Sequence, residues 1–389
     1  MPIPTFHESS LSLLQSAVHQ VLLRRGAVAA GSTSAAHPAM QAVVAAGAAY
    51  TQPGQAPSDI GPDIEVCAKL AVEYIFATGL KKQLLHDELT GSVCDPLWAE
   101  ALVEYEWVQA TGKKIPYLPY DPAIRPNPPM ALPSDTLNIA LLADWGMGTN
   151  LAVNVLAQAV TALSGGNTPG QQAAASALIH MGDIYYAGTP AECQQHFLDA
   201  VKSAVPAAFS RDFPVYAIPG NHEYYSGGFG YYGTVLPRLS GQTNSFFCLR
   251  TDQWQVVALD TGRNDHDPFT VVSNITLLTP DQVEWLDTVM LTAGGRGTIL
   301  LTHHQLYSGA GPVGERKPIK YGINPHLYSQ LKPYFGQIAV WLWGHEHNTV
   351  IFNPERGLPL GRCIGSGSIP MLVVQNPYEQ DPNLVGWTG

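Results

Sequence analysis

The stretch Gly182-Asp183-Ile184-Tyr185-Tyr186 directly follows a short apolar run, Ala177–Met181. A short apolar run that ends at a glycine is typical of a buried strand, so Asp183 is expected just past the strand's carboxyl end. His180 lies inside the run, and we interpret it as a core histidine rather than a ligand. Ligands of open α/β sheets bind where the carboxyl ends of strands meet, so this stretch predicts a site at that edge.

Polar residues also follow the other predicted strands, which are Leu137 to Ala143, Pro214 to Ile218, Thr298 to Leu301 and Ile338 to Leu342. Helical patterns alternate with these strands, which predicts a mainly parallel sheet covered on both sides. The polar segments are, in order, Asp144-Trp145-Gly146, Gly220-Asn221-His222-Glu223, Thr302-His303 and Gly344-His345-Glu346-His347. Each segment alone is explained equally well as a turn or a helix cap. Together they indicate one site whose carboxylate, amide and imidazole ligands suit iron, zinc or manganese.

These segments resemble the signature motifs of the calcineurin-like metallophosphoesterases, and among them those of the purple acid phosphatases. Most members of the superfamily carry a histidine two residues after the first aspartate, where this chain has Gly146. Purple acid phosphatases instead carry Gly-Asp-x-x-Tyr, and that spacing selects Tyr186. The resemblance covers Leu137 to Gly367. It implies an α/β fold, the calcineurin-like metallophosphoesterase sandwich.

The resemblance also implies a site for two metal ions. The first ion, Fe(III) in the family, would be held by Asp144, Asp183, Tyr186 and His347. The second, Fe(II), Zn(II) or Mn(II), would be held by Asp183, Asn221, His303 and His345. A metal-bound hydroxide would then attack the phosphorus of a phosphate monoester. His222 would stabilise the transferring group or protonate the leaving group.

Three further residues are candidates for contacts around the ligands or with the substrate. Glu223 is expected to orient His222 or a water, or else to be a plain surface carboxylate. His304 adjoins His303, and a strand register one residue different would make it the ligand instead. Tyr224 opens a loop rich in Tyr and Gly that is expected to be either a mobile pocket wall touching the leaving group or a flexible surface loop.

The chain is expected to have two domains joined by a proline-rich segment. Residues 1–114 show helical patterns without recognisable chemistry, 115–135 contain prolines typical of an extended linker or wrapping arm, and 136–389 carry the motifs. The first region is the expected seat of partner, lid, targeting or oligomer contacts. The native chain could continue past Gly389.

Composition is compatible with the small phosphorylated substrate that the resemblance implies. The formal net charge of -11 argues against nucleic acid and anionic lipid surfaces. No apolar run is long enough to span a membrane, and the amino end does not resemble a signal peptide. These features predict a cytoplasmic protein or one exported by a non-classical route, and they leave the oligomeric state open. The Cys residues are scattered and are expected to be buried thiols.

Other activities remain as alternatives to the monoesterase. A phosphodiesterase or a nucleotide pyrophosphohydrolase would use the same fold, and a non-catalytic scaffold would act through the amino-terminal region. A Ser/Thr protein phosphatase is disfavoured, because the resemblance would require Asp-Arg-Gly where the chain has Tyr186-Ala187-Gly188.

Overall fold

The computed structural model describes residues 78–80, 97–132, 137–165, 175–267, 275–308, 313, 322–354, 356–368 and 384–386. The predicted helices before residue 97 therefore lie outside the described residues, and so does nearly all of the predicted helical domain. Its last predicted helix is present as α5 (Leu97–Thr111), which begins directly after Asp95-Pro96.

The strands form two main sheets and a short two-stranded pair. A three-stranded parallel sheet has the order β2-β3-β4, and an eight-stranded mixed sheet has the order β1-β5-β6-β7-β10-β12-β11-β13. The expected α/β sandwich is confirmed and the predicted strands are present, but they divide between two sheets, whereas the strand pattern alone predicts one mainly parallel sheet. The bounds are β1 Met130–Ala131, β2 Leu137–Leu142, β3 Ala175–His180, β4 Val215–Ala217, β5 Phe247–Arg250, β6 Trp254–Leu259, β7 Gly297–Thr302, β8 Tyr307–Ser308, β9 Gly322–Ile323, β10 Ile338–Trp343, β11 Thr349–Phe352, β12 Gly361–Ile364 and β13 Leu384–Gly386.

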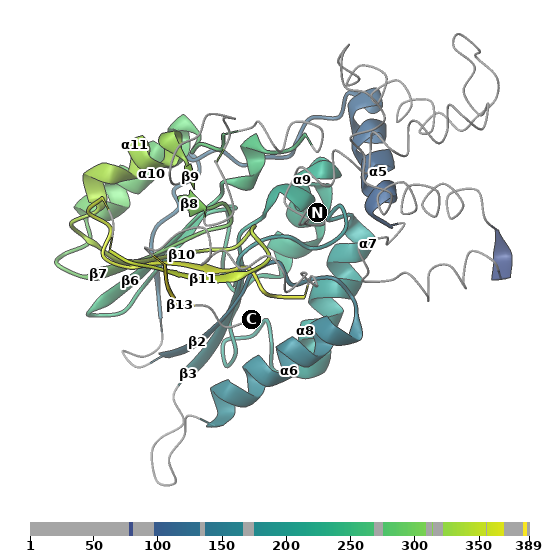
Figure 1. The fold of residues 1–389 in the computed structure, drawn as a ribbon, viewed down its shortest axis with the longest axis horizontal. Helices are drawn as coiled ribbons and strands as arrows, with labels where there is room; N and C mark the ends of the chain where they lie inside the picture. The colour runs from purple at the N-terminus through teal and green to yellow at the C-terminus, as the bar shows by residue number, and fades with distance from the viewer. Residues whose placement is uncertain are drawn as a thin grey trace.

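Helices cover the outer faces of the two sheets, so the layers run helices, sheet, sheet, helices (Figure 1). Beside the small sheet lie α6 and α8, and against the large sheet lie α10 and α11. The helix bounds are α6 Asn150–Gly165, α7 Pro190–Glu192, η2 Cys193–Asp199, α8 Ala200–Ala204, α9 Asn221–Tyr225, η3 Tyr231–Val235, η4 Leu236–Arg238, η5 Gly262–Asn264, α10 Pro280–Leu291, α11 Pro325–Leu331 and η6 Lys332–Tyr334.

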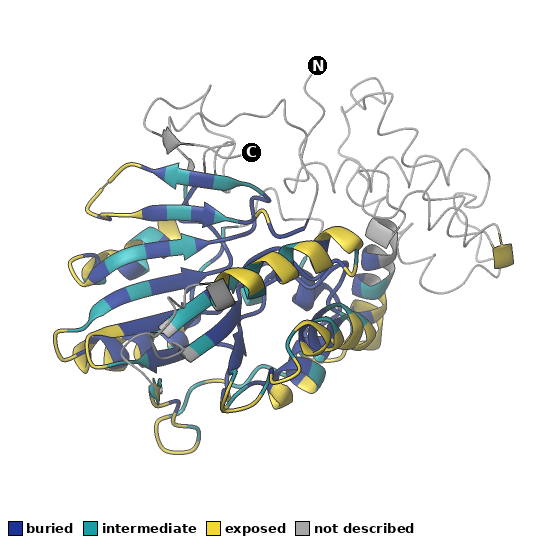
Figure 2. Ribbon diagram, turned by 90° about the horizontal axis from the view of Figure 1, so that it is seen from below, coloured by how far each residue is buried: buried dark blue, intermediate teal, exposed yellow. Residues whose placement is uncertain are grey.

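Side-chain alternation along β3 explains how one strand serves two cores. Leu178 packs with α6 and the η2–α8 segment, whereas Ile179 packs between the sheets with Val256 and Leu301. Successive side chains of a strand point to opposite faces, so a continuous apolar run is needed where both faces are buried. Figure 2 shows the result: the strands are mostly buried, and the outer helices expose one face.

The proline-rich segment lies along the sandwich as a wrapping arm. The Tyr117 hydroxyl donates to Asp281 Oδ2 at 2.9 Å, and the Tyr120 N–H donates to the same oxygen at 2.8 Å. Further along, the Asn127 side chain donates to the Phe246 carbonyl at 2.8 Å, and Trp285 Nε1 donates to the Asn127 carbonyl at 2.7 Å. Proline lacks an N–H, so side chains make many of the arm's contacts, and the end of the arm pairs with β5 of the large sheet as β1.

No helix in the described part of the chain is long and apolar enough to cross a membrane.

Candidate metal centre

The predicted site residues lie together at the carboxyl ends of β2, β3, β4, β7 and β10. Four of them have positive φ: Asp144 (54°), Asp183 (71°), His345 (69°) and His347 (45°). Residues other than glycine rarely adopt this conformation, and such strain gathers at functional sites. Here it turns the chain sharply just after a strand, so that each side chain faces the gap between the two sheets.

One group of donors surrounds the Tyr185 hydroxyl. That hydroxyl lies 3.1 Å from Asp144 Oδ1, 3.3 Å from Asp183 Oδ2 and 2.9 Å from His347 Nε2. His347 Nε2 is also 3.5 Å from Asp144 Oδ1. All four side chains are buried, so their oxygen and nitrogen atoms face one another rather than water.

The tyrosine of this group differs from the expected one. The three-residue spacing from Asp183 selects Tyr186, but the hydroxyl that the structure places beside Asp183 belongs to the neighbouring Tyr185. Tyr186 contributes its carbonyl instead, which accepts a hydrogen bond from His222 Nδ1 at 2.6 Å.

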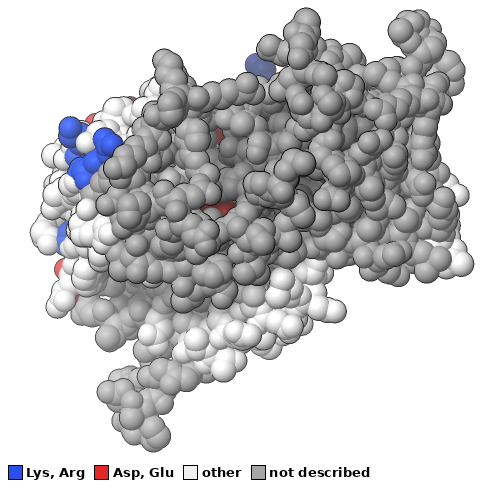
Figure 3. Space-filling view, in the orientation of Figure 1, with Lys and Arg blue, Asp and Glu red and all other residues white. Residues whose placement is uncertain are grey.

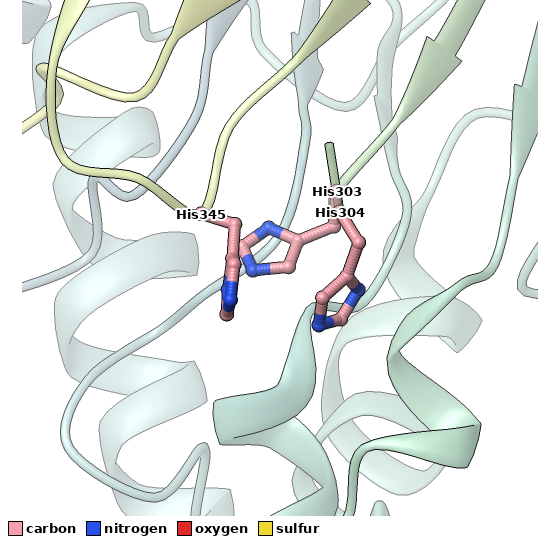
Figure 4. A group of neighbouring side chains, drawn as sticks. All are labelled: His303, His304 and His345. Carbon is pink, nitrogen blue, oxygen red and sulfur yellow. The ribbon is translucent and has the colours of Figure 1, made fainter. Parts of the chain in front are cut away.

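A second group of donors lies beside the first and is formed by Asn221, His303 and His345. Asn221 Oδ1 lies 3.1 Å from both His303 Nε2 and His345 Nδ1. His303 Nε2 is 3.3 Å from Asp183 Oδ2, the same oxygen that faces Tyr185. Figure 4 shows the rings of His303, His304 and His345 gathered in one cluster. Asp183 therefore stands where one carboxylate can bridge both groups.

The hydrogen bonds that orient these side chains leave several hydrogen-bond acceptor atoms facing one another. Acceptor atoms that converge in this way can bind a cation. His303 Nδ1 lies 3.0 Å from the Met181 carbonyl, which can only accept, so Nδ1 carries a proton. In the neutral ring Nε2 then presents a lone pair toward Asn221 Oδ1 and Asp183 Oδ2. These three acceptor atoms repel one another unless a proton or a metal ion lies between them. The residues fit a metal centre.

Burial and mutual charge shift the pKa values of the acidic groups in opposite directions. Burial raises the pKa of Asp144 to about 7. Burial alone would raise the pKa of Asp183 as well, but the His303 and His222 rings hold it well below its usual range. Conversely, burial opposes charge on His303, yet Asp183 beside it raises the pKa of that ring to about 10. Positive charge is therefore stabilised beside Asp183, where a cation would be held.

His222 follows the ligand Asn221 and presents one ring nitrogen to the site. Its Nδ1 is paired with the Tyr186 carbonyl, so this nitrogen carries a proton. Its Nε2 lies 3.8 Å from Asp183 Oδ2, beside the proposed ligands rather than among them. The ring is thus oriented to hold or give a proton at Nε2.

Glu223 has a different role from the one expected. Its carboxylate accepts the backbone N–H groups of Asp183 at 3.1 Å, Ile184 at 2.6 Å and Gly220 at 2.7 Å. It is 1% exposed, so it is not a surface carboxylate. Its hydrogen bonds connect the loop after β3 to the loop after β4, and they hold the backbone of Asp183 in place.

His304 lies next to the second group, but both of its ring nitrogens are occupied. Nε2 lies 3.1 Å from Asp265 Oδ2, and Nδ1 lies 2.9 Å from Thr261 Oγ1. Burial lowers the pKa of His304, which favours the neutral ring. The ring packs against that of His345, with centroids 4.4 Å apart. Asp265 did not stand out in the sequence, because it occupies an ordinary loop position.

Tyr224 is part of the core, in contrast to both expectations for its loop. It is 2% exposed, and its hydroxyl donates to Asp260 Oδ2 at 2.5 Å and lies 2.9 Å from the Tyr232 hydroxyl. The segment from residue 224 to 235 forms α9, a turn and η3, and its tyrosines are buried. This buried segment directly follows Asn221, His222 and Glu223 and packs in the core beside the site.

The family model described as calcineurin-like phosphoesterase matches residues 137–349, which is more than half of the chain. The chain belongs to the calcineurin-like phosphoesterases. Its matched region contains every strand end that carries a predicted ligand up to His347. A search of curated proteins finds no significant match.

Several solved structures are similar to this calcineurin-like phosphoesterase. A purple acid phosphatase from yellow lupin seeds is 15% identical, with 64% of this chain and 48% of that chain covered and a TM-score of 0.44. GAP50 of Plasmodium, the anchor in the inner membrane complex, is 15% identical over 60% of this chain and 72% of that chain, at a TM-score of 0.38. A putative 5'-nucleotidase from Staphylococcus aureus is 14% identical, with 59% of this chain and 48% of that chain covered and a TM-score of 0.36. The aligned part spans about half of the lupin protein's length.

Proposed function

We propose that this chain hydrolyses phosphate monoesters at a binuclear metal centre. The observation that carries the proposal is the position of Asp183, whose Oδ2 lies 3.3 Å from both the Tyr185 hydroxyl and His303 Nε2. One carboxylate shared by two donor groups is the arrangement that holds two ions close together, as in-line displacement at phosphorus requires.

The donor types suggest which ion each group would hold. The first group, Asp144, Asp183, Tyr185 and His347, offers mostly oxygen, and a phenolate with carboxylates suits a hard ion such as Fe(III). The second group, Asp183, Asn221, His303 and His345, offers an amide oxygen and two imidazoles, which suit Fe(II), Zn(II) or Mn(II). When bound, such ions activate water and offset charge on phosphoryl oxygens.

The chain's own residues would orient the substrate and handle the proton of the leaving group. His222 Nδ1 donates to the Tyr186 carbonyl, which aims Nε2 at the site, so the doubly protonated ring would give its Nε2 proton to a leaving alkoxide beside Asp183. Glu223 and the backbone N–H of His222, which donates to Asp183 Oδ1 at 3.1 Å, keep the bridging carboxylate in place. Holding reactants in one geometry is a main source of rate in phosphoryl transfer.

We expect the substrate to be a small phosphorylated molecule rather than a nucleic acid. The described lysine and arginine side chains on the face in Figure 3 gather mainly at the left edge, where α10 and α11 lie in Figure 1. The formal net charge of -11 favours a compact substrate over a long polyanion.

The proposal is tested by measuring bound metal and hydrolysis on one purified preparation. We expect close to two ions per chain and turnover of para-nitrophenyl phosphate at least tenfold above that of bis(para-nitrophenyl) phosphate. A tenfold preference for the diester would replace the monoesterase with a phosphodiesterase. Two bound ions with no hydrolysis of either compound between pH 4 and 9 would support the scaffold alternative instead.

A further inference from the structure

The side-chain amide of Asn221 is hydrogen-bonded to a tyrosine one helical turn further along α9. Asn221 Nδ2 donates to the Tyr225 hydroxyl at 2.6 Å. The same amide directs Oδ1 toward His303 Nε2 and His345 Nδ1, each 3.1 Å away. Asn221 is 2% exposed and Tyr225 is 1% exposed, so water does not compete for either end of the amide.

The two ends of this amide are not equivalent toward a cation. The oxygen has lone pairs to share, whereas the NH2 group is a donor and repels a cation. A cation at the second group therefore requires Oδ1 to face inward, and the NH2 group must then find an acceptor behind it. The Tyr225 hydroxyl is that acceptor. Without it, binding a cation would leave a buried donor unpaired, which is costly.

We infer that Tyr225 is a positioning residue for the second ion, acting through the orientation of the Asn221 amide. The inference rests on the proposed function, since it takes Asn221 as a ligand. Tyr225 also packs against His222, with ring centroids 4.6 Å apart, so one side chain supports both the ligand and the proposed proton donor. The i and i+4 spacing on α9 places the tyrosine directly behind the amide.

The experiment is a double-mutant cycle read out as metal retention. Full-length proteins with metals bound are dialysed against buffers whose free zinc concentration is set by a chelator, and the retained ions are counted by elemental analysis. For Tyr225→Phe we expect the second ion to be half lost at a free zinc concentration about 10- to 100-fold higher than in the wild type. In an Asn221→Ala background, adding Tyr225→Phe should change the midpoint by no more than about twofold.

Tyr231→Phe is the matched control. Its hydroxyl donates to the Ala217 carbonyl at 2.7 Å, it is also 1% exposed, and no proposed ligand contacts it in the described structure. It should lose a comparable buried hydrogen bond and retain both ions as the wild type does. Thermal unfolding of each variant shows whether the folds remain comparable.

The outcomes separate this inference from the proposed function. A wild-type chain that binds fewer than two ions would overturn both. If the wild type binds two ions and hydrolyses a phosphoester, but Tyr225→Phe retains the second ion normally, the inference alone is wrong. The inference is also wrong if Tyr225→Phe weakens retention of the second ion by the same factor in the wild type and in the Asn221→Ala variant.

Discussion

The Tyr185 hydroxyl lies 2.9 Å from Nε2 of His347, although the two residues are 162 positions apart. Tyr185 follows β3 of the small sheet, and His347 follows β10 of the large sheet. The contact therefore joins the carboxyl edges of both sheets at one point. It also makes Tyr185, and not its neighbour, the phenol nearest to Asp144 and Asp183.

The first prediction concerns which tyrosine binds iron. A tyrosinate bound to Fe(III) absorbs visible light, so the oxidised, iron-loaded wild type should be coloured. Tyr185→Phe should abolish the band, because it removes the only one of the two hydroxyls that the structure places beside Asp183. Tyr186→Phe should retain it. The reverse result would show that iron selects the tyrosine given by the Gly-Asp-x-x-Tyr spacing, and a colourless wild type would contradict the ferric assignment.

The second prediction distinguishes the two adjacent histidines. His303→Asn should reduce metal content toward one ion per chain, because Nε2 of His303 faces both Asn221 and Asp183. His304→Asn should keep both ions, since the ring nitrogens of His304 are paired with Asp265 and Thr261. Elemental analysis of the two purified variants decides between them. Loss of an ion only in His304→Asn would assign the ligand to the other register.

The sequence was sufficient to predict the strands and to place the candidate ligands at their carboxyl ends. Apolar runs such as Leu137 to Ala143 are visible because both faces of these strands are buried, and β2 covers Leu137–Leu142. The division into two sheets was not predictable in the same way. It depends on pairings between distant strands, such as β10 with β12, which no local pattern specifies.

Side-chain direction was the other limit of sequence-based prediction. The spacing after Asp183 could not decide between two adjacent tyrosines, because the positive φ of Asp183 changes the direction of the following chain. Glu223 was recognised as a site residue, but its backbone partners come from a loop about forty positions earlier in the chain. Tyr225 could have been found from its i+4 spacing to Asn221 alone.

The third prediction tests how Glu223 holds the site. Gln at position 223 keeps the size of the side chain but replaces one acceptor oxygen with an NH2 donor that faces backbone N–H groups. We expect Glu223→Gln to lower the free energy of unfolding by about 1–3 kcal/mol and to weaken metal retention about 10- to 100-fold. Asp281→Asn is the control, because Asp281 accepts from Tyr117 and Tyr120 on the arm, away from the ligands. A change in stability without a change in retention would limit Glu223 to a structural role.

The fourth prediction is an acid-dependent loss of stability caused by His180. This ring lies between Trp145 and Phe197, is 1% exposed, and has no partner for Nε2 among the described residues. Burial lowers its pKa to about 3, whereas an unfolded histidine has a pKa of about 6.5. The unfolded chain therefore binds the proton first as pH falls, and the stabilisation present above pH 6.5 is lost between about 6.5 and 3. The loss should approach about 1.4 kcal/mol per pH unit within that window.

Two variants isolate this contribution from that of the other titrating groups. His180→Leu has a similar volume and cannot titrate, so its free energy of unfolding should fall less steeply than that of the wild type between pH 6.5 and 4. His180→Asn cannot titrate either, and it should show the same shallower slope even though a buried amide lowers its stability at neutral pH. Urea unfolding at a series of pH values measures both the slope and the offset. Equal slopes in the wild type and both variants would show that His180 reaches solvent or a proton acceptor in the folded protein.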